Sequence, residues 1–158
     1  YKVKLTFKFF QIINPHIAHI GVGIAIIGIT CSSVFQNELD FNLNEGDEFN
    51  INGKIVLFKE IETTNQINFQ ALRGKFFFDI EKDKTKKIEA GKNYYPVSKM
   101  ITSEAGILHQ WNKDIYFILG DQKNNEWFVK VLINPFVSFI WLGVIIMMYS
   151  GLIAVSRR

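Results

Sequence analysis

The chain has 158 residues, 48% of them hydrophobic, and a formal net charge of +3 at neutral pH. Its apolar residues are concentrated at the two ends instead of being spread as in a water-soluble core, which indicates a membrane protein. No base-reading motif is present, so the positive charge does not indicate nucleic-acid binding.

The first apolar segment, residues 15–35, contains no acid or base. At about 1.5 Å per residue it can cross a hydrocarbon layer of roughly 30 Å. Three lysines, Lys2, Lys4 and Lys8, precede it. It lies too far into the chain, and is too long, for a signal peptide. We therefore predict that residues 1–35 form a cytoplasmic lead and a transmembrane helix.

Two histidines, His16 and His19, lie where this segment begins. An imidazole at that depth is costly without a partner, and a metal or haem iron is one such partner. A lone His-x-x-His lacks the third ligand and the glutamate base of a zinc hydrolase. Each histidine could instead be an interfacial residue bonded to backbone or headgroups, an interpretation that suits His16 better than His19.

Small residues recur beside His19 at steps of three and four. Such a stripe lets another helix or a flat macrocycle approach closely, and helix packing is the more common use. Its members are Ala18, Gly21, Ala25, Gly28 and Ser32.

Residues 36–134 hold all fifteen acidic residues and are predicted to form one exported, mainly-β domain, a small barrel or sandwich. We expect five or six strands, around residues 39–43, 49–51, 54–61, 68–80, 115–119 and 127–133. The charged stretch 79–89 is predicted to be a solvated hairpin or loop. For residues 94–106 we expect a loop or short helix near the membrane.

The second apolar segment, residues 135–155, also lacks charge and ends in Arg157 and Arg158. Residues 135–158 are thus predicted to form a second transmembrane helix and a cytoplasmic basic tail. By the positive-inside rule both termini lie in the cytoplasm or an organelle matrix. Because the chain begins at Tyr1, we expect it to be a fragment or one piece of a longer protein whose other helices are missing.

The remaining reactive residues have ordinary interpretations. Cys31 cannot form an internal disulfide and is expected to be a packing residue. His109 could contact a cofactor, although a surface histidine is the commoner case, and Trp141 suits an interfacial anchor. No Ser-His-Asp set, Cys-x-x-Cys or phosphate loop is present, so catalysis by this chain alone is unsupported.

Several blocks together resemble CcmF, the large membrane subunit of the cytochrome c haem lyase in System I cytochrome c maturation. They occur in the family's order and approximate spacing, and nearly the whole chain resembles the family's C-terminal quarter or so. The blocks are Ala18-His19-Ile20-Gly21-Val22 with Gly28-Ile29, Met100 to Ile107, Lys113-Asp114-Ile115-Tyr116 with Leu119-Gly120, Trp127 leading to Asn134-Pro135-Phe136-Val137, and Ile140-Trp141-Leu142-Gly143.

The resemblance implies haem handling at the outer face of a membrane. Family members hold a b-type haem between two transmembrane histidines, and His19 in its Ala-His-x-Gly setting matches one of them. They receive haem from the chaperone CcmE and, with CcmH-type subunits, help attach it to apocytochrome c. The opposing ligand and the external haem-holding histidines lie upstream in the family, so the resemblance implies one component of a lyase that needs the remaining CcmF helices.

Some positions depart from the family pattern, such as Asn134 where lysine is usual. These departures fit a divergent or organelle-encoded member, so we expect a multi-pass protein of the bacterial inner membrane or, alternatively, the mitochondrial inner membrane. The competing hypothesis is a haem-free, membrane-tethered interaction module with the same topology. A transporter half is disfavoured because the two apolar segments share no similarity.

Overall fold

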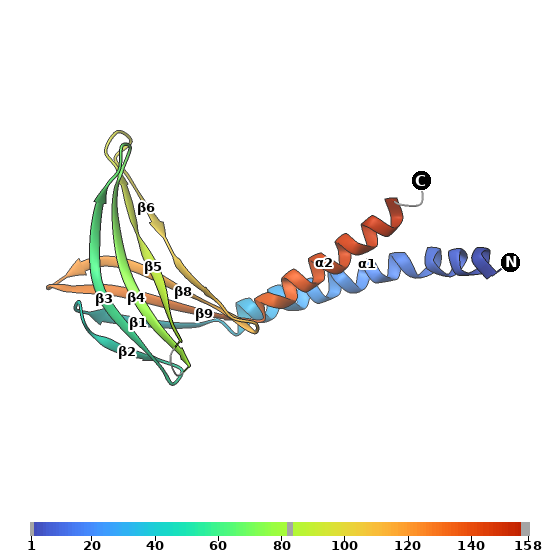
Figure 1. Ribbon diagram of the computed structural model, residues 1–158, viewed down its shortest axis with the longest axis horizontal. Helices are drawn as coiled ribbons and strands as arrows, with labels where there is room; N and C mark the ends of the chain where they lie inside the picture. The colour runs from blue at the N-terminus through green and yellow to red at the C-terminus, as the bar shows by residue number, and fades with distance from the viewer. Residues whose placement is uncertain (1, 82–83, 156–158) are drawn as a thin grey trace. The chain divides into compact units, whose positions relative to one another are not determined.

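The structure is a computed structural model that describes residues 2–81 and 84–155, with side chains described for residues 14–78 and 85–155. These residues form two helices and nine strands (Figure 1). The elements are α1 (Lys2–Val34), β1 (Asn37–Leu43), β2 (Glu48–Ile51), β3 (Lys54–Asn65), β4 (Gln70–Glu81), β5 (Lys84–Tyr95), β6 (Met100–Glu104), β7 (Gly106–His109), β8 (Lys113–Lys123), β9 (Glu126–Pro135) and α2 (Val137–Val155).

The chain divides into two compact units. The helical unit contains α1, α2 and the short segment Trp111–Lys113; the strand unit contains Asn37–Gln110 and Asp114–Ile133. The short segment belongs with the helices because the Phe136 backbone N–H donates to the Asn112 carbonyl at 2.9 Å, just before α2.

Both apolar segments are helical, as the sequence predicted. Asn14–Val34 and Val137–Val155 are long and apolar enough to cross a membrane. Only 17% and 11% of their apolar windows are buried. The core helix of a water-soluble protein is mostly buried, so this exposure favours helices surrounded by lipid.

Helix α1 begins well before the position expected from the sequence. It starts at Lys2 and continues through Pro15, the first residue of the apolar segment and the predicted helix start. Proline lacks the N–H that would bond one turn back, but the rest of the helical ladder is kept, and transmembrane helices tolerate such a defect. The lysine-bearing segment therefore extends the same helix beyond the apolar span.

The strand unit is a sandwich of two antiparallel sheets. One sheet has the order β1-β9-β8-β7 and the other β2-β3-β4-β5-β6. In Figure 1 the long strands β3, β4 and β5 run across the direction of β1, β8 and β9. Only Ala105 separates β6 from β7, so the chain changes sheets there. A Cβ on the next residue, Gly106, would lie 2.6 Å from the Glu89 carbonyl oxygen, which is why glycine suits this corner.

Phenylalanine rings from both sheets form the centre of the core. The Phe76 ring of β4 lies 5.0 Å from that of Phe58 on β3 and 5.3 Å from that of Phe117 on β8, measured between centroids. All three side chains are fully buried. Aliphatic residues surround them, including Ile51, Val56, Leu108, Ile115, Leu119, Val129 and Val131. Burial of this apolar surface is the main force that holds the two sheets together.

A polar cluster joins three strands of the five-stranded sheet. Asn93 of β5 is only 2% exposed; its amide nitrogen donates to Glu104 of β6 at 2.6 Å, and its amide oxygen accepts from Arg73 of β4 at 2.6 Å. The Arg73 guanidinium also donates to Glu104 at 2.7 Å. Because both partners of Asn93 are charged, these bonds belong to the strong class.

The predicted fold class, two apolar helices that flank a mainly-β domain, is confirmed, and of the two β forms considered the sandwich is found. All six predicted strands are present, as β1, β2, β3, β4, β8 and β9. The charged stretch 79–89 is a hairpin formed by the ends of β4 and β5, one of the two forms expected. The prediction for residues 94–106 was wrong, because Met100–Glu104 pairs with Gly91–Tyr95 as β6. Residues 82–83, between β4 and β5 in sequence, lie outside the described part.

Candidate functional site

The α1–α2 contact uses the stripe of small residues. A Cβ on Gly21 would lie 2.8 Å from the Gly143 carbonyl oxygen, and one on Gly28 would lie 2.7 Å from the Ile140 nitrogen. Gly21, Ala25 and Gly28 are buried on this face of α1. The stripe is therefore filled by α2, so of the two uses considered, a helix rather than a macrocycle occupies it.

A buried polar contact joins the same two helices nearer to the ends of the chain. The Asn14 amide nitrogen donates to the Ser150 carbonyl at 3.0 Å, and the Ser150 hydroxyl lies 2.9 Å from the Asn14 side-chain and main-chain oxygens. Both residues are buried, 8% and 3% exposed. Such bonds between helices stabilise a pair in a membrane because no water competes for them.

His19 projects away from α2. It lies two residues before Gly21, and at about 100° per residue this places its Cβ roughly 160° around α1 from the α2 contact. The imidazole is exposed, and its Nδ1 lies 2.6 Å from the Pro15 carbonyl oxygen. A carbonyl can only accept, so Nδ1 donates in this bond, and in the neutral ring Nε2 then carries the lone pair. A metal-ligating histidine typically donates its other ring N–H to a carbonyl or carboxylate, and His19 has this arrangement.

The surface of α1 beside His19 is flat and open. Gly23 follows one turn later on the same face, and a Cβ built there meets nothing within 4 Å. Ile26 continues this face and is 57% exposed. We call His19, Gly23 and Ile26 the outer face of α1. It combines one available nitrogen ligand with an apolar surface, which is what a planar iron cofactor requires.

The other candidate residues lie elsewhere. His16 is exposed on the side of α1 away from α2, and Cys31 is partly buried with a free thiol. Trp141, near the start of α2, is 65% exposed. Within the described ranges no cluster of three or more His, Cys, Asp or Glu side chains could hold a metal ion.

His109 is ordered by a carboxylate in the strand unit. Its Nδ1 lies 3.0 Å from the Asp114 carboxylate, which is 8% exposed, while the imidazole is 69% exposed. Tyr116 follows Asp114 on the same face of β8, and burial, with a smaller contribution from the Asp114 charge, raises the pKa of its phenol. This pair is remote in sequence from His19 and in the other unit.

The outward surface of the β1-β9-β8-β7 sheet combines ion-paired residues, with Lys130 on β9 3.1 Å from Glu38 and 3.8 Å from Asp40 on β1, and an apolar patch on β7, β8 and β9. We call this patch the apolar sheet face; Ile107 and Phe128 are its most exposed members, at 41% and 36%. Tyr116, Ile118 and Leu132 are half-buried on the same side by the alternation of β8 and β9. Isolated exposed apolar residues are common, but several on neighbouring strands of one sheet indicate an interaction surface.

The outward surface of the other sheet is charged. Lys75 on β4 lies 3.0 Å from the Glu60 carboxylate on β3 and also pairs with Glu62. Hydrogen bonding and charge attraction from Lys75 hold the pKa of Glu60 below its ordinary value. The two carboxylates, Glu62 first, raise the pKa of the Lys75 ammonium. These pairs mark a solvated surface.

His19 and the stripe could be identified from the sequence, whereas the open position at Gly23 and the pairing of Asp114 with His109 were not predicted. The signal for Gly23 was present, since His19 and Gly23 are four apart and must share a face of a helix. The signal for Asp114 was weak, because its pairing with His109 depends on the β7–β8 register. Within the part of the chain that is described, neither His19 nor His109 belongs to a cluster of three or more metal-ligating side chains.

Comparison with known proteins identifies relatives of this chain. A family described as the CcmF C-terminal beta-sandwich matches residues 34–135. The cytochrome c-type biogenesis protein CcmF of Haemophilus influenzae is 31% identical over 145 residues, covering 90% of this chain and 22% of that protein. CcmF of Pseudomonas aeruginosa is 29% identical over 143 residues, with the same coverage. CcmF of Escherichia coli is 28% identical over 153 residues, covering 95% of this chain and 23% of that protein.

A solved structure, named cytochrome c heme lyase CcmF, shares the fold. It superposes with a TM-score of 0.75 at 12% identity, over 92% of this chain and 24% of that chain. The chain therefore spans about a fifth to a quarter of the length of the proteins it resembles.

Proposed function

This chain belongs to the CcmF family of cytochrome c biogenesis proteins, and we propose that it forms the C-terminal part of a membrane haem lyase in which His19 is one axial ligand of a b-type haem. The observation that carries the proposal is the geometry of His19. Its Nδ1–H is held by the Pro15 carbonyl, which leaves Nε2 free to bind iron from an exposed position.

The macrocycle would pack on the outer face of α1, opposite α2. Gly23 leaves room for a flat ring one turn from the ligand, and the exposed Ile26 side chain supplies apolar contact. The stripe at Gly21 is already covered by α2, so a haem bound by His19 would not compete with the helix pair. The opposing ligand would come from the upstream helices of the longer family protein.

The proposed haem would lie toward the side of the membrane that faces the chain termini. His19 is only about one helical turn from Pro15, where the apolar span begins. With both termini in the cytoplasm or matrix, the strand unit is exported and incoming haem is handled on the opposite side. A haem at His19 would therefore carry electrons to the reaction site and would not become the product.

We assign the docking of partners to the strand unit. The apolar sheet face offers exposed Ile107 and Phe128 for a CcmE-type haem chaperone, a CcmH-type subunit or apocytochrome c. The charged surface around Lys75 is well supplied with ion pairs and suits exposure to water. The assignment of partner docking to the apolar sheet face is tested in the assembled complex.

The sharpest test compares single substitutions in the complete assembly. His19→Ala should abolish the bis-histidine b-haem absorption spectrum in the purified complex, because iron loses one axial nitrogen. His16→Ala is the matched control: it removes an exposed imidazole three residues away on the same helix and should leave the spectrum intact. Gly23→Leu should lower haem occupancy, because its side chain would fill the space beside the ligand.

An unchanged spectrum in His19→Ala would refute the ligand assignment. The competing function, a haem-free, membrane-tethered assembly module, predicts no Soret band even when the chain is coexpressed with the missing helices. Under that alternative, Ile107→Asp should reduce the capture of partner proteins because it alters the apolar sheet face. His19→Ala should leave partner capture unchanged.

A further inference from the structure

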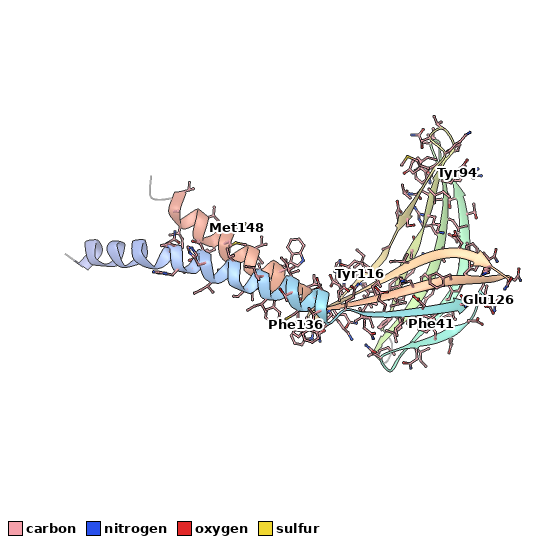
Figure 2. All side chains as sticks on the ribbon, turned by 180° about the vertical axis from the view of Figure 1, so that it is seen from behind. Phe41, Tyr94, Tyr116, Glu126, Phe136 and Met148 are labelled. Atoms are coloured by element: carbon pink, nitrogen blue, oxygen red, sulfur yellow. The ribbon has the colours of Figure 1, made fainter. Side chains whose placement is uncertain are left out.

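An aromatic cluster marks one end of the helix pair. Phe35 directly follows α1, and Phe136 directly precedes α2. Their ring centroids lie 6.4 Å apart, and the Phe136 ring stacks on that of Phe139 at 5.7 Å. Figure 2 shows Phe136 at one end of α2 and Met148 farther along the same helix. The two helices thus share a common, aromatic end.

The segment Trp111–Lys113 is fastened to this end. The Ser138 hydroxyl donates to the Trp111 carbonyl, and the Phe136 N–H donates to the Asn112 carbonyl at 2.9 Å. Phe136 makes its bond from a left-handed backbone conformation, with φ of 63°. A bulky residue rarely adopts this conformation because it is energetically costly. The contacts around Phe136 must therefore offset that cost. Trp111 is held in place although its side chain is 87% exposed.

Beside Trp111 the helical unit contains a pocket of about 380 Å³. Its lining is dominated by aromatic and aliphatic side chains, and the residues are Trp111, Asn112, Phe136, Ser138, Phe139 and Leu142. None of these side chains is an imidazole, thiolate or thioether, so the pocket offers no ordinary ligand for haem iron. Its volume is at the lower end of the range for small-molecule sites. The pocket suits a slender apolar ligand.

The length of the helices places this pocket at a membrane boundary. At about 1.5 Å per residue the two apolar spans, Asn14–Val34 and Val137–Val155, are each about 30 Å long, which matches the hydrocarbon layer. Both spans end at the aromatic cluster, so the pocket lies where hydrocarbon meets headgroups. Leu142 and Phe139 connect its lining to the exposed apolar surface of α2. Tryptophan is enriched at this depth.

We propose that the pocket binds one acyl chain of a phospholipid from the leaflet at the end of the helices nearest Phe136. The lining contacts the part of the acyl chain nearest the headgroup, and the half-buried Lys113, next to Asn112 in sequence, supplies the positive charge for the phosphate. The bound lipid anchors the Trp111 segment and so sets the depth of the helix pair. This inference requires the chain to span a membrane but does not depend on haem.

The three tryptophans allow a direct test in single-tryptophan variants. The full chain, with any subunits that copurify, is reconstituted in phosphatidylcholine brominated near the headgroup end of its acyl chain. Fluorescence of Trp111 should fall by at least roughly twofold, as should that of the lipid-exposed Trp141. Trp127, half-buried on β9, is the negative control. Lipid brominated near the terminal methyl should quench Trp111 less.

A matched pair of substitutions separates pocket binding from simple surface contact. Leu142→Phe narrows the pocket and should reduce the quenching of Trp111, whereas Ile145→Phe, exposed on the same helix outside the lining, should not. If Leu142→Phe does not fold, Asn112→Phe closes the pocket from its other side. Quenching of Trp111 no greater than that of Trp127, or equal quenching in all variants, would overturn the proposal.

Discussion

The buried amide of Asn93 should stabilise the sandwich far more than an exposed asparagine. Asn93→Ala removes two bonds to charged partners, one to Arg73 and one to Glu104, both at 2.6 Å. Bonds of this kind contribute about 1.5–3 kcal/mol each. Because the Glu104 side chain is 55% exposed, water can replace part of the loss. We therefore take the lower values and expect a decrease of about 3 kcal/mol in the free energy of unfolding.

This free energy can be measured by urea unfolding of the full chain in detergent micelles. Trp127 reports on the strand unit once Trp111 and Trp141 are replaced by phenylalanine. The midpoint should move to lower urea with an unchanged slope. Asn42→Ala is the control, because Asn42 is an exposed residue of β1 in the same sandwich. It should change the free energy of unfolding by no more than about 0.5 kcal/mol.

A double substitution tests whether the three side chains act together. If Asn93 works through its charged partners, then Asn93→Ala combined with Glu104→Ala should cost less than the sum of the two single changes. A loss below about 1 kcal/mol for Asn93→Ala, or strict additivity, would refute the reasoning that the cluster joins β4, β5 and β6.

Two more predictions concern the helix pair and the charged surface. Gly143→Ala should destabilise the α1–α2 contact by about 1–3 kcal/mol in an SDS titration, because its Cβ would lie 2.5 Å from the Gly21 carbonyl oxygen. Gly151→Ala meets nothing within 4 Å, and an equal loss there would contradict this explanation. The lowered pKa of Glu60 should stabilise the fold above an unfolded-state pKa of about 4.3, and this contribution is lost as pH falls through the lower folded-state pKa. Lys75→Met should therefore flatten the acid limb of a stability–pH curve, and an unchanged limb would show that the pair is not coupled to folding.

The two helices and six of the nine strands follow directly from sequence patterns. A lipid-spanning helix needs only length and hydropathy, so residues 15–35 and 135–155 were enough to identify the two spans. The strands β1 and β2 alternate apolar and polar residues because one face of each packs on the core, and that period is visible in the sequence. The family resemblance rested on blocks in order, and His19 is one of the residues that carry it.

Other features depend on partners that the local sequence does not reveal. The strand β5 is rich in lysine, and β6 has few apolar residues, so neither shows a strong alternating pattern; their conformation is fixed by pairing with β4 and with each other. Residues in such strands are stabilised by neighbours distant in sequence, which is why β-structure is context-dependent. The helix start at Lys2 was likewise hidden by Pro15.

For the site, the sequence by itself determined that an imidazole lies one turn inside an apolar helix among small residues. Only the tertiary structure decided that Gly21 and Gly28 are used by α2, so that His19 and the open position at Gly23 belong to the opposite face. The physical reason is that a helical sequence fixes angles between side chains but not which face a neighbour will cover. That choice depends on close packing between residues more than a hundred positions apart.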